Sequence, residues 1–485
     1  MISARFGLAF LAASALALSQ VFASASSVGP PALVSGPGPS PFATGCNEKP
    51  GTNPPSVNYE NAEVEPFVAV NPVSGRLLGI YQQDRWSDGG AHGLVAARSA
   101  DGSSWTESWA AFSDCSGNSA YDRASDPWVT FDPNGNAYAI SLSASADLIT
   151  SAVLVAKSSD GGATWSAPTT VIRDDSFVHF NDKESITADP TRPGYVYAVW
   201  DRSTFPSEPR NPRSFLGSHA FRGQPMFSRT TDGGATWSTP VGMANSNIFT
   251  LGNQIGVLPD GTLVDIFANF RGSGSQPSDN QSFQAVMVSR DAGSHWSPPI
   301  SIANDVFADT LDPDSGHPVR AGNDIPDLAV DPRNGTIYAV WADGAFGGGA
   351  STNVSLSIST DGGHKWSAPM KVNKSPAGVS AFTPSVAVSS DGTVGVTYYD
   401  FRNNTPGLRT DVWFVQSHDG GKTWTEEDQL GGPFDIATAP DAGGYFLGDY
   451  EGLATVGKNF LAFFVMANSG NVANRTDVFT VTITE

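Results

Sequence analysis

Short segments with the pattern of β-strands recur along most of the chain. In residues 354–358, valine, leucine and isoleucine alternate with serine, and residues 152–156 form a continuous apolar run. Alternation with a period of two places apolar side chains on one face of a strand, whereas a short apolar run fits a strand that is buried on both faces. The pattern therefore predicts an all-β protein built from short strands.

An eight-residue turn pattern follows many of these segments. Residues 158–165 read Ser-Ser-Asp-Gly-Gly-Ala-Thr-Trp, and copies occur at 230–237, 289–296, 359–366 and 417–424, with a shorter copy at 99–105. The aspartate of such a turn can accept hydrogen bonds from backbone N–H groups, the glycines allow positive φ, and the tryptophan folds back as an apolar plug. We therefore predict structural turns around six aspartates: Asp101, Asp160, Asp232, Asp291, Asp361 and Asp419.

A second hairpin pattern precedes these turns. It occurs at residues 68–80, 129–140, 186–199, 255–266, 328–340, 386–397 and 452–465. Each unit then has four antiparallel strands in about 60 to 70 residues, which is typical of a β-propeller blade. The hairpins predict seven blades, which we favour, and the tryptophan turns predict six. The last unit lacks its fourth strand, and we expect residues 56–63 to supply it.

The first 60 residues differ from the rest of the chain. Residues 1–25 contain an early arginine, an apolar stretch at 6–18 and a small-x-small site at 23–25, the pattern of a cleaved signal peptide. Residues 26–60 are rich in proline, glycine and serine, which predicts an arm that precedes a propeller domain at 61–485. We therefore expect a secreted or periplasmic protein without a membrane span.

The only two cysteines are Cys46 and Cys115. In an oxidising compartment two cysteines usually pair, so we expect a disulfide that ties the arm to the first unit. The alternative is two free thiols.

Composition excludes several classes of partner. The chain has 51 glycines and 34 prolines among 485 residues, too many for a helical protein. Its net charge of −21 repels phosphate backbones and anionic bilayers, so we expect neither nucleic acid nor a membrane as partner. We expect a monomer.

The turn at 158–165 and its copies resemble the Asp box, or BNR repeat, of sialidases. The resemblance covers nearly all of residues 61–485, and it implies a β-propeller with sialidase-like glycoside hydrolase activity on acidic carbohydrate. Sialidases use an arginine triad for the substrate carboxylate, a tyrosine nucleophile partnered by glutamate, and an aspartate acid/base. Asp boxes also occur in propellers without catalysis, so a non-catalytic protein that binds a glycan or protein is the alternative.

Candidate site residues gather at the ends of the predicted strands that lie opposite the Asp boxes. Carboxylates at the starts of the innermost strands and a neighbouring tyrosine are the expected catalytic groups: Asp126, Glu184, Tyr450 and Glu451. Arginines just past the second strands are the expected substrate ligands, because a planar guanidinium binds a carboxylate bidentately: Arg85, Arg202, Arg271 and Arg402. In the alternative interpretation, these arginines form ion pairs with neighbouring aspartates and Tyr450 belongs to the core.

No cofactor is required by this interpretation. The seven histidines show no zinc-binding spacing. Calcium stays an open alternative, because an acidic ring of oxygen donors is what a hard cation prefers.

Overall fold

The structure is a computed structural model that describes residues 26–36, 38–42, 46, 56–204, 222–245, 248–272 and 280–484. Nearly all of its regular structure is β-strand, with short 3-10 helices at η1 (Asp114–Ser116), η4 (Ala345–Gly347) and η5 (Ile436–Thr438). Within these ranges, no helix combines the length and the apolar character needed to cross a bilayer.

The strands form antiparallel meanders of four that follow one another along the chain. The first half contains β3 (Asn58–Val70), β4 (Leu77–Trp86), β5 (Ala91–Ser99) and β6 (Trp105–Ser108); β7 (Arg123–Phe131), β8 (Ala137–Ala144), β9 (Thr150–Ser158) and β10 (Thr169–Asp175); and β11 (His179–Ala188), β12 (Val196–Thr204), β13 (Arg222–Thr230) and β14 (Val241–Gly242).

The second half repeats this order. It contains β15 (Thr250–Val257), β16 (Leu263–Gly272), β17 (Asn280–Ser289) and β18 (Ile300–Asn304); β20 (Asp327–Val330), β21 (Ile337–Asp343), β22 (Asn353–Ser359) and β23 (Met370–Lys371); β24 (Ala381–Val388), β25 (Val394–Asp400), β26 (Thr410–Ser417) and β27 (Asp428–Phe434); and finally β29 (Gly452–Val456), β30 (Asn459–Ala467) and β31 (Thr476–Thr484). Two further short strands, β19 (Val319–Arg320) and β28 (Tyr445–Phe446), pair in parallel outside the meanders.

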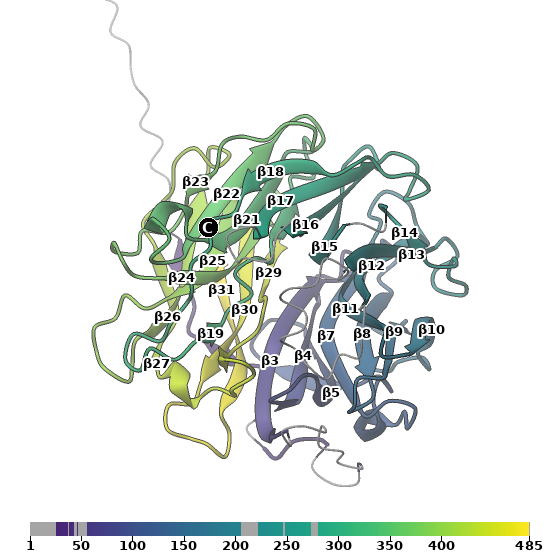
Figure 1. Ribbon diagram of the computed structural model, residues 1–485, viewed down its shortest axis with the longest axis horizontal. Coiled ribbons are helices and arrows are strands. Elements are labelled where there is room, and N and C mark those ends of the chain that lie inside the picture. The colour runs from purple at the N-terminus through teal and green to yellow at the C-terminus, as the bar shows by residue number, and fades with distance from the viewer. Residues whose placement is uncertain are drawn as a thin grey trace, which may run out of the picture.

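The meanders are arranged as a β-propeller, and the colours of Figure 1 run around the ring in chain order. The last meander is completed from the N-terminus, because β1 (Ser27–Val28) and β2 (Ala32–Leu33) both pair antiparallel with β31. Our expectation that residues 56–63 supply this strand is wrong. Most of that segment belongs to β3, which pairs with β4 and meets β31 at the single position Ala62. The physical reason is that β1 and β2 occupy the edge of β31, whereas β3 is the inner strand of the sheet that it forms with β4.

The apolar core lies between neighbouring meanders. For example, Ile140 and Val155 pack with Val196, Ala198 and Trp200 in one buried cluster. The tryptophans of the repeated turns border separate clusters of this kind: Trp105, Trp165, Trp237, Trp296, Trp366 and Trp424. The turns thus add apolar contacts between sheets, which is the structural role that the repeat predicts.

The repeated turns have the hydrogen bonds expected of their aspartates. Asp160 Oδ1 accepts the backbone N–H groups of Ala163 and Thr164 at 3.0 and 2.9 Å, and Oδ2 accepts the Thr164 hydroxyl at 2.6 Å. The hydroxyl and backbone donors of Thr164 hold the pKa of this exposed carboxyl at about 2. Asp232 makes the equivalent bonds with Thr236, and its pKa is also about 2.

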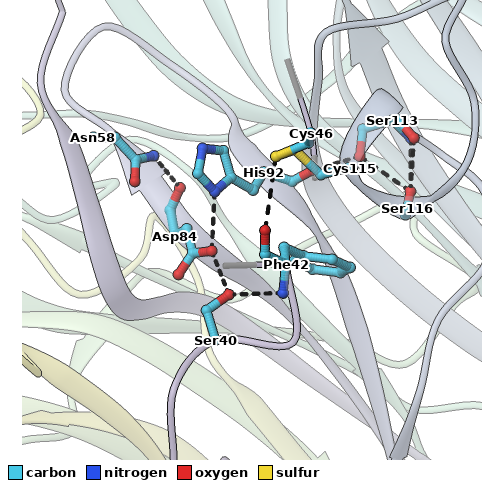
Figure 2. The surroundings of a disulfide bond; sticks show 9 residues. All are labelled: Ser40, Phe42, Cys46, Asn58, Asp84, His92, Ser113, Cys115 and Ser116. Carbon is cyan, nitrogen blue, oxygen red and sulfur yellow. Dashed lines mark hydrogen bonds and ion pairs between the residues drawn. A yellow bond between two sulfur atoms is a disulfide. The ribbon is translucent and has the colours of Figure 1, made fainter. Parts of the chain in front are cut away.

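A disulfide joins Cys46 to Cys115, with the two Cα atoms 4.5 Å apart. Figure 2 shows His92 between this disulfide and Asp84. The Nδ1 atom of His92 lies 3.0 Å from Oδ2 of Asp84. Asp84 Oδ2 also accepts the hydroxyl of Ser40, so the N-terminal arm is bound to β4 by a polar contact and to η1 by the disulfide. The arm therefore packs beside the end of β4, which leads into the candidate site.

Candidate functional site

Three innermost strands contain β-bulges with positive φ at residues that bear the candidate site's charged side chains. Glu65 in β3, Asp126 in β7 and Lys183 in β11 have φ of 53°, 50° and 50°, and each lies where the register with the next strand shifts. Such backbone is costly for residues with a Cβ and persists where the surrounding structure enforces it. Here it brings the three side chains into one cluster.

Lys183 is the centre of this cluster. Its Nζ lies 2.9 Å from Glu65 Oε1, 2.9 Å from Asp126 Oδ1 and 2.7 Å from Asp449 Oδ2. All four side chains are at most 8 % exposed, and the ammonium also lies over the Tyr450 ring at 5.6 Å. One buried cation thus links three strands that are distant in the sequence with the loop before β29.

The long connection between β18 and β20 brings Arg320 to the same place. Its guanidinium binds both oxygens of Asp449, with Nε at 3.1 Å from Oδ1. Gly322 allows this approach, because a Cβ there would lie 2.1 Å from the backbone oxygen of Asp449. The guanidinium groups of Arg320 and Arg85 both lie over the ring of Phe446, at 4.5 and 4.7 Å.

A cavity of about 180 Å³ opens beside this cluster. Its charged wall contains four cationic and three acidic side chains: Arg85, Arg123, Lys183, Arg320, Asp88, Asp126 and Asp182. The lining also includes four apolar side chains: Leu142, Ala144, Leu148 and Phe180. Four cationic side chains thus gather beside apolar side chains, within a protein whose net charge is −21. Arg123 is paired with Asp88, and Lys183 and Arg320 share Asp449.

Two carboxyls on the cavity wall have pKa values shifted in opposite directions. Burial, and then the nearby charge of Asp126, raise the pKa of Asp182 to about 7. Burial also opposes ionisation of Asp126, but the Lys183 ammonium outweighs it and holds the pKa of Asp126 below its usual value. Asp182 can therefore hold a proton near neutral pH while Asp126 is ionised, a combination that general acid catalysis can use.

The rest of the cluster is also strongly perturbed. Burial raises the pKa of Glu65 to about 7 despite the opposing charge of Lys183. For Asp449, burial is outweighed by Arg320 and Lys183, so its pKa lies well below the usual range. The three carboxylates outweigh the burial of Lys183 and raise its pKa, so it stays an ammonium.

The expected catalytic residues fall on two neighbouring cavities. Asp126 lines the large cavity, whereas Glu184, Tyr450 and Glu451 line a smaller one of about 30 Å³ that shares Lys183 with it. The hydroxyl of Tyr450 donates to the Pro127 carbonyl at 3.1 Å, and its ring packs against Trp128. Burial and the neighbouring carboxylates, first that of Glu65, raise the pKa of Tyr450.

Of the expected arginines, Arg85 lines the large cavity, where its Nη1 donates to Gln82 at 2.7 Å. Arg202 instead makes a bidentate ion pair with Asp174, with Nε at 2.8 Å from Oδ2. Arg402 binds Asp400 and Glu427 and stacks on Trp413. In the part of the chain that the structure describes, neither Arg202 nor Arg402 lines the large cavity. The side chain of Arg271 lies outside the described part of the chain.

Sequence reasoning missed four residues of the site: Arg123, Asp182, Lys183 and Arg320. Arg123 is the first residue of β7, where it binds Asp88 at 2.6 Å and lies over the Trp86 ring. Asp182 and Lys183 immediately precede the expected residue Glu184 in β11, and these two side chains line the large cavity. Arg320 lies outside every repeat unit, and no periodic signal marks it.

One cluster has the composition of a metal site but not its chemistry. Atoms of Cys46, His92 and Cys115 lie within 4.8 Å of one another. The disulfide between the two cysteines removes the thiolates that a zinc ion would need.

Comparison with known proteins gives similarity only at the level of structure. No protein-family model matches the chain, and no curated protein sequence matches it either. A Dyadobacter fermentans protein of unknown function is 13 % identical, covering 87 % of this chain and 94 % of its own, with a TM-score of 0.45.

Two further structures are enzymes. The Hadza microbial sialidase Hz136 is 16 % identical over 85 % of this chain and 74 % of its own, with a TM-score of 0.47. An α-L-arabinofuranosidase from Fusarium graminearum is 16 % identical over 77 % of this chain and 93 % of its own, also at 0.47. The structural neighbours thus include sialidases and arabinofuranosidases, and at these identities the likeness concerns the fold alone.

Proposed function

We propose that the protein is a secreted glycoside hydrolase acting on acidic carbohydrate. The observation that carries this proposal is the concentration of Arg85, Arg123, Arg320 and Lys183 around one cavity of a strongly acidic protein. Only such a local cluster can offset the repulsion that an anionic substrate meets elsewhere on the surface. The Nε of Arg85 is buried without a partner among the described residues, so the cluster keeps an unused donor.

In this proposal Asp182 is the general acid. It donates its proton to the glycosidic oxygen as the bond breaks, because its pKa of about 7 keeps much of it protonated at neutral pH. Asp126 stays ionised and stabilises the positive charge that develops on the sugar ring. Water then attacks the anomeric carbon and gives a proton to Asp182, which returns to its acid form. Glu65 and Asp449 hold the Lys183 ammonium, which in turn keeps Asp126 ionised.

The arginines bind the acidic group of the substrate in this account. Arg320 is the most accessible of the set, with a side chain that is 34 % exposed. Its Nε and Nη2 bind Asp449, and its Nη1 donates to the Ala442 carbonyl at 3.4 Å, so the Nη1 edge is the part of the guanidinium that can hold a substrate carboxylate. Glu184, Tyr450 and Glu451 then have a positioning role behind Lys183, on the wall of the smaller cavity.

The test is turnover of matched glycosides, such as a fluorogenic glucuronide and sialoside against the corresponding neutral glucoside. We expect release from an acidic glycoside, and Arg320→Lys should raise KM for it about tenfold or more without a similar change for a neutral one. Arg202→Lys, outside the cavity, is the matched control. Saturable glycan binding without release from any glycoside would favour the non-catalytic alternative.

We also propose that the meanders form seven blades, with β1 and β2 as the outer strand of the last blade. The support is the succession of inner strands β3, β7, β11, β15, β20, β24 and β29 along the chain. An experimental density map with six sheets around the axis would contradict this count.

A further inference from the structure

The turn between β8 and β9 carries an exposed leucine in an unfavourable backbone conformation. Leu148 has a φ of 57°, in the left-handed region that glycine and asparagine adopt more readily, and it is 39 % exposed. Within the described ranges it does not belong to either of the buried apolar clusters that contain residues of β8. Neither the turn nor the core therefore accounts for a leucine at this position.

Hydrogen bonds fix the turn in this conformation. The N–H of Leu148 donates to the Ser145 carbonyl at 2.9 Å, and the N–H of Ser145 donates to the Thr150 carbonyl at 3.0 Å. Asp147 Oδ1 accepts the Ser145 hydroxyl at 2.6 Å and the N–H of Ile149 at 3.1 Å. Residues that the surrounding structure holds in a costly conformation cluster at ligand sites. The turn thus presents the Leu148 side chain in a fixed place.

That place is the large cavity, which Leu148 lines together with Phe180 and Asp182. Phe180 and Asp182 are two residues apart in a regularly paired part of β11, so their side chains leave the strand on the same side. Asp182 is the group that protonates the glycosidic oxygen in the proposed function. An apolar side chain beside Asp182 is therefore close to the bond that breaks.

The strand order places the charged and apolar parts of the cavity at different distances from the propeller axis. Asp126 belongs to the inner strand β7, and β8 and β9 follow outward. Leu148, in the turn between β8 and β9, therefore lies outward of Asp126 and of the Lys183 ammonium that binds it. Arg320 belongs to the inner part, because it shares Asp449 with Lys183. A ligand that fills the cavity thus directs its anionic group inward and its other end towards Leu148.

We propose that Leu148 and Phe180 form a subsite for an aromatic leaving group, so that the ligand is an aryl glycoside of an acidic sugar. This inference rests on the proposed function, because it takes Asp182 as the acid that protonates the leaving oxygen. An aromatic ring offers these two side chains an apolar face. A second sugar would instead place hydroxyl groups against side chains that cannot bond them, which costs free energy.

The test measures binding of thioglycosides, which carry sulfur in place of the glycosidic oxygen and resist hydrolysis. Isothermal titration calorimetry on the full chain compares the phenyl and methyl thioglycosides of glucuronic acid and of sialic acid. We expect the phenyl form of an acidic sugar to bind about tenfold more tightly than its methyl form, because burial of the ring removes apolar area from water. The neutral phenyl thioglucoside should bind about tenfold more weakly than the acidic phenyl form.

Leu148→Asn separates a binding role from a structural one. Asparagine adopts positive φ more readily than leucine, so Tm should stay the same or rise, whereas the preference for phenyl over methyl should fall to about twofold or less. Val456→Asn is the matched control, because Val456 is also 39 % exposed but is the last residue of β29, at the end of that inner strand away from the site. It should keep the full preference. If Leu148→Asn does not fold, Leu148→Gly replaces it with the same expected loss of preference.

Three results would overturn the proposal: equal binding of phenyl and methyl forms, an unchanged preference in the Leu148 variant, or equally tight binding of the neutral phenyl thioglucoside. Lack of binding by every acidic thioglycoside at about 10 mM would overturn it as well. Preferential phenyl binding without turnover of any glycoside would remove the hydrolase assignment and keep the apolar subsite. Turnover of acidic glycosides without a phenyl preference would keep the hydrolase assignment and remove the subsite.

Discussion

The two ends of the propeller use the same residue type in opposite ways. At the repeated turns, Asp160, Asp232 and Asp291 are exposed, and local donors hold their pKa values at about 2. At the starts of the inner strands, Asp182 and Glu65 are desolvated, and their pKa values rise to about 7. An exposed, fully bonded carboxylate stabilises a turn, whereas a desolvated one can move a proton.

Repetition separates these two roles. The six turns repeat nearly the same residues, because each makes the same kind of link at the edge of its sheet. The bulges of five inner strands repeat the backbone but not the side chain: Glu65, Asp126, Lys183, Gly252 and Thr383. The comparison teaches that, in this chain, the repeated positions build the fold and the site lies where the repeat diverges.

Removing the ammonium group of Lys183 should give the largest loss of stability. Lys183→Met leaves three buried carboxylates without their shared partner, which we expect to cost about 3 to 5 kcal/mol of unfolding free energy. Lys157→Met is the matched control near the turns, where the ammonium binds the Gly233 carbonyl and lies over the ring of Tyr138. Urea unfolding of both variants measures the difference. Equal losses would show that Lys183 is not the centre of the site.

Disrupting a repeated turn should have a smaller effect, confined to stability. Asp160→Ala removes acceptors for Ala163 and Thr164, and loss of a capping interaction of this kind costs about 1 kcal/mol. Thermal melting and kcat on the same preparation are the measurements. A fall in kcat with unchanged melting would contradict the assignment of the turns to structure.

Much of the fold is predictable from the sequence, because the period of the turns and hairpins reports local backbone directly. The site is less predictable. Arg85 and Asp126 could be located from their place in the repeat, and both line the cavity. Arg202 occupies the same kind of position, yet Asp174 in β10 binds its guanidinium. Which arginine is free depends on packing between strands, and the repeat carries no information about that.

Arg320 shows a second reason why the site cannot be predicted from the sequence. It reaches the site through a connection outside the repeat, and its place depends on the pairing of β19 with β28. That pairing brings together segments more than a hundred residues apart, through two-residue strands that have no recognisable pattern.

The pH dependence of stability should show the two ends of the propeller as two separate limbs. The turn aspartates have lowered pKa values, so their contribution is present above pH 4 and is lost as pH falls towards 2. Glu65, Asp182 and Glu451 have raised values of about 7, 7 and 8, so their contribution is present below pH 4 and is lost as pH rises to 8. Melting should therefore peak between about pH 4 and 6. A maximum above pH 8 would contradict the account.

The pH profile of kcat/KM on an acidic glycoside, measured for the unchanged protein and for Asp182→Asn, tests the central claim most directly. If Asp182 is the general acid, activity falls above a pKa near 7, and the variant loses about a hundredfold or more together with this limb. Glu65→Gln is the control, because it removes the other carboxyl of similar pKa in the cluster and should keep the limb. An unchanged profile in Asp182→Asn would contradict the claim that this cavity is a glycoside hydrolase site.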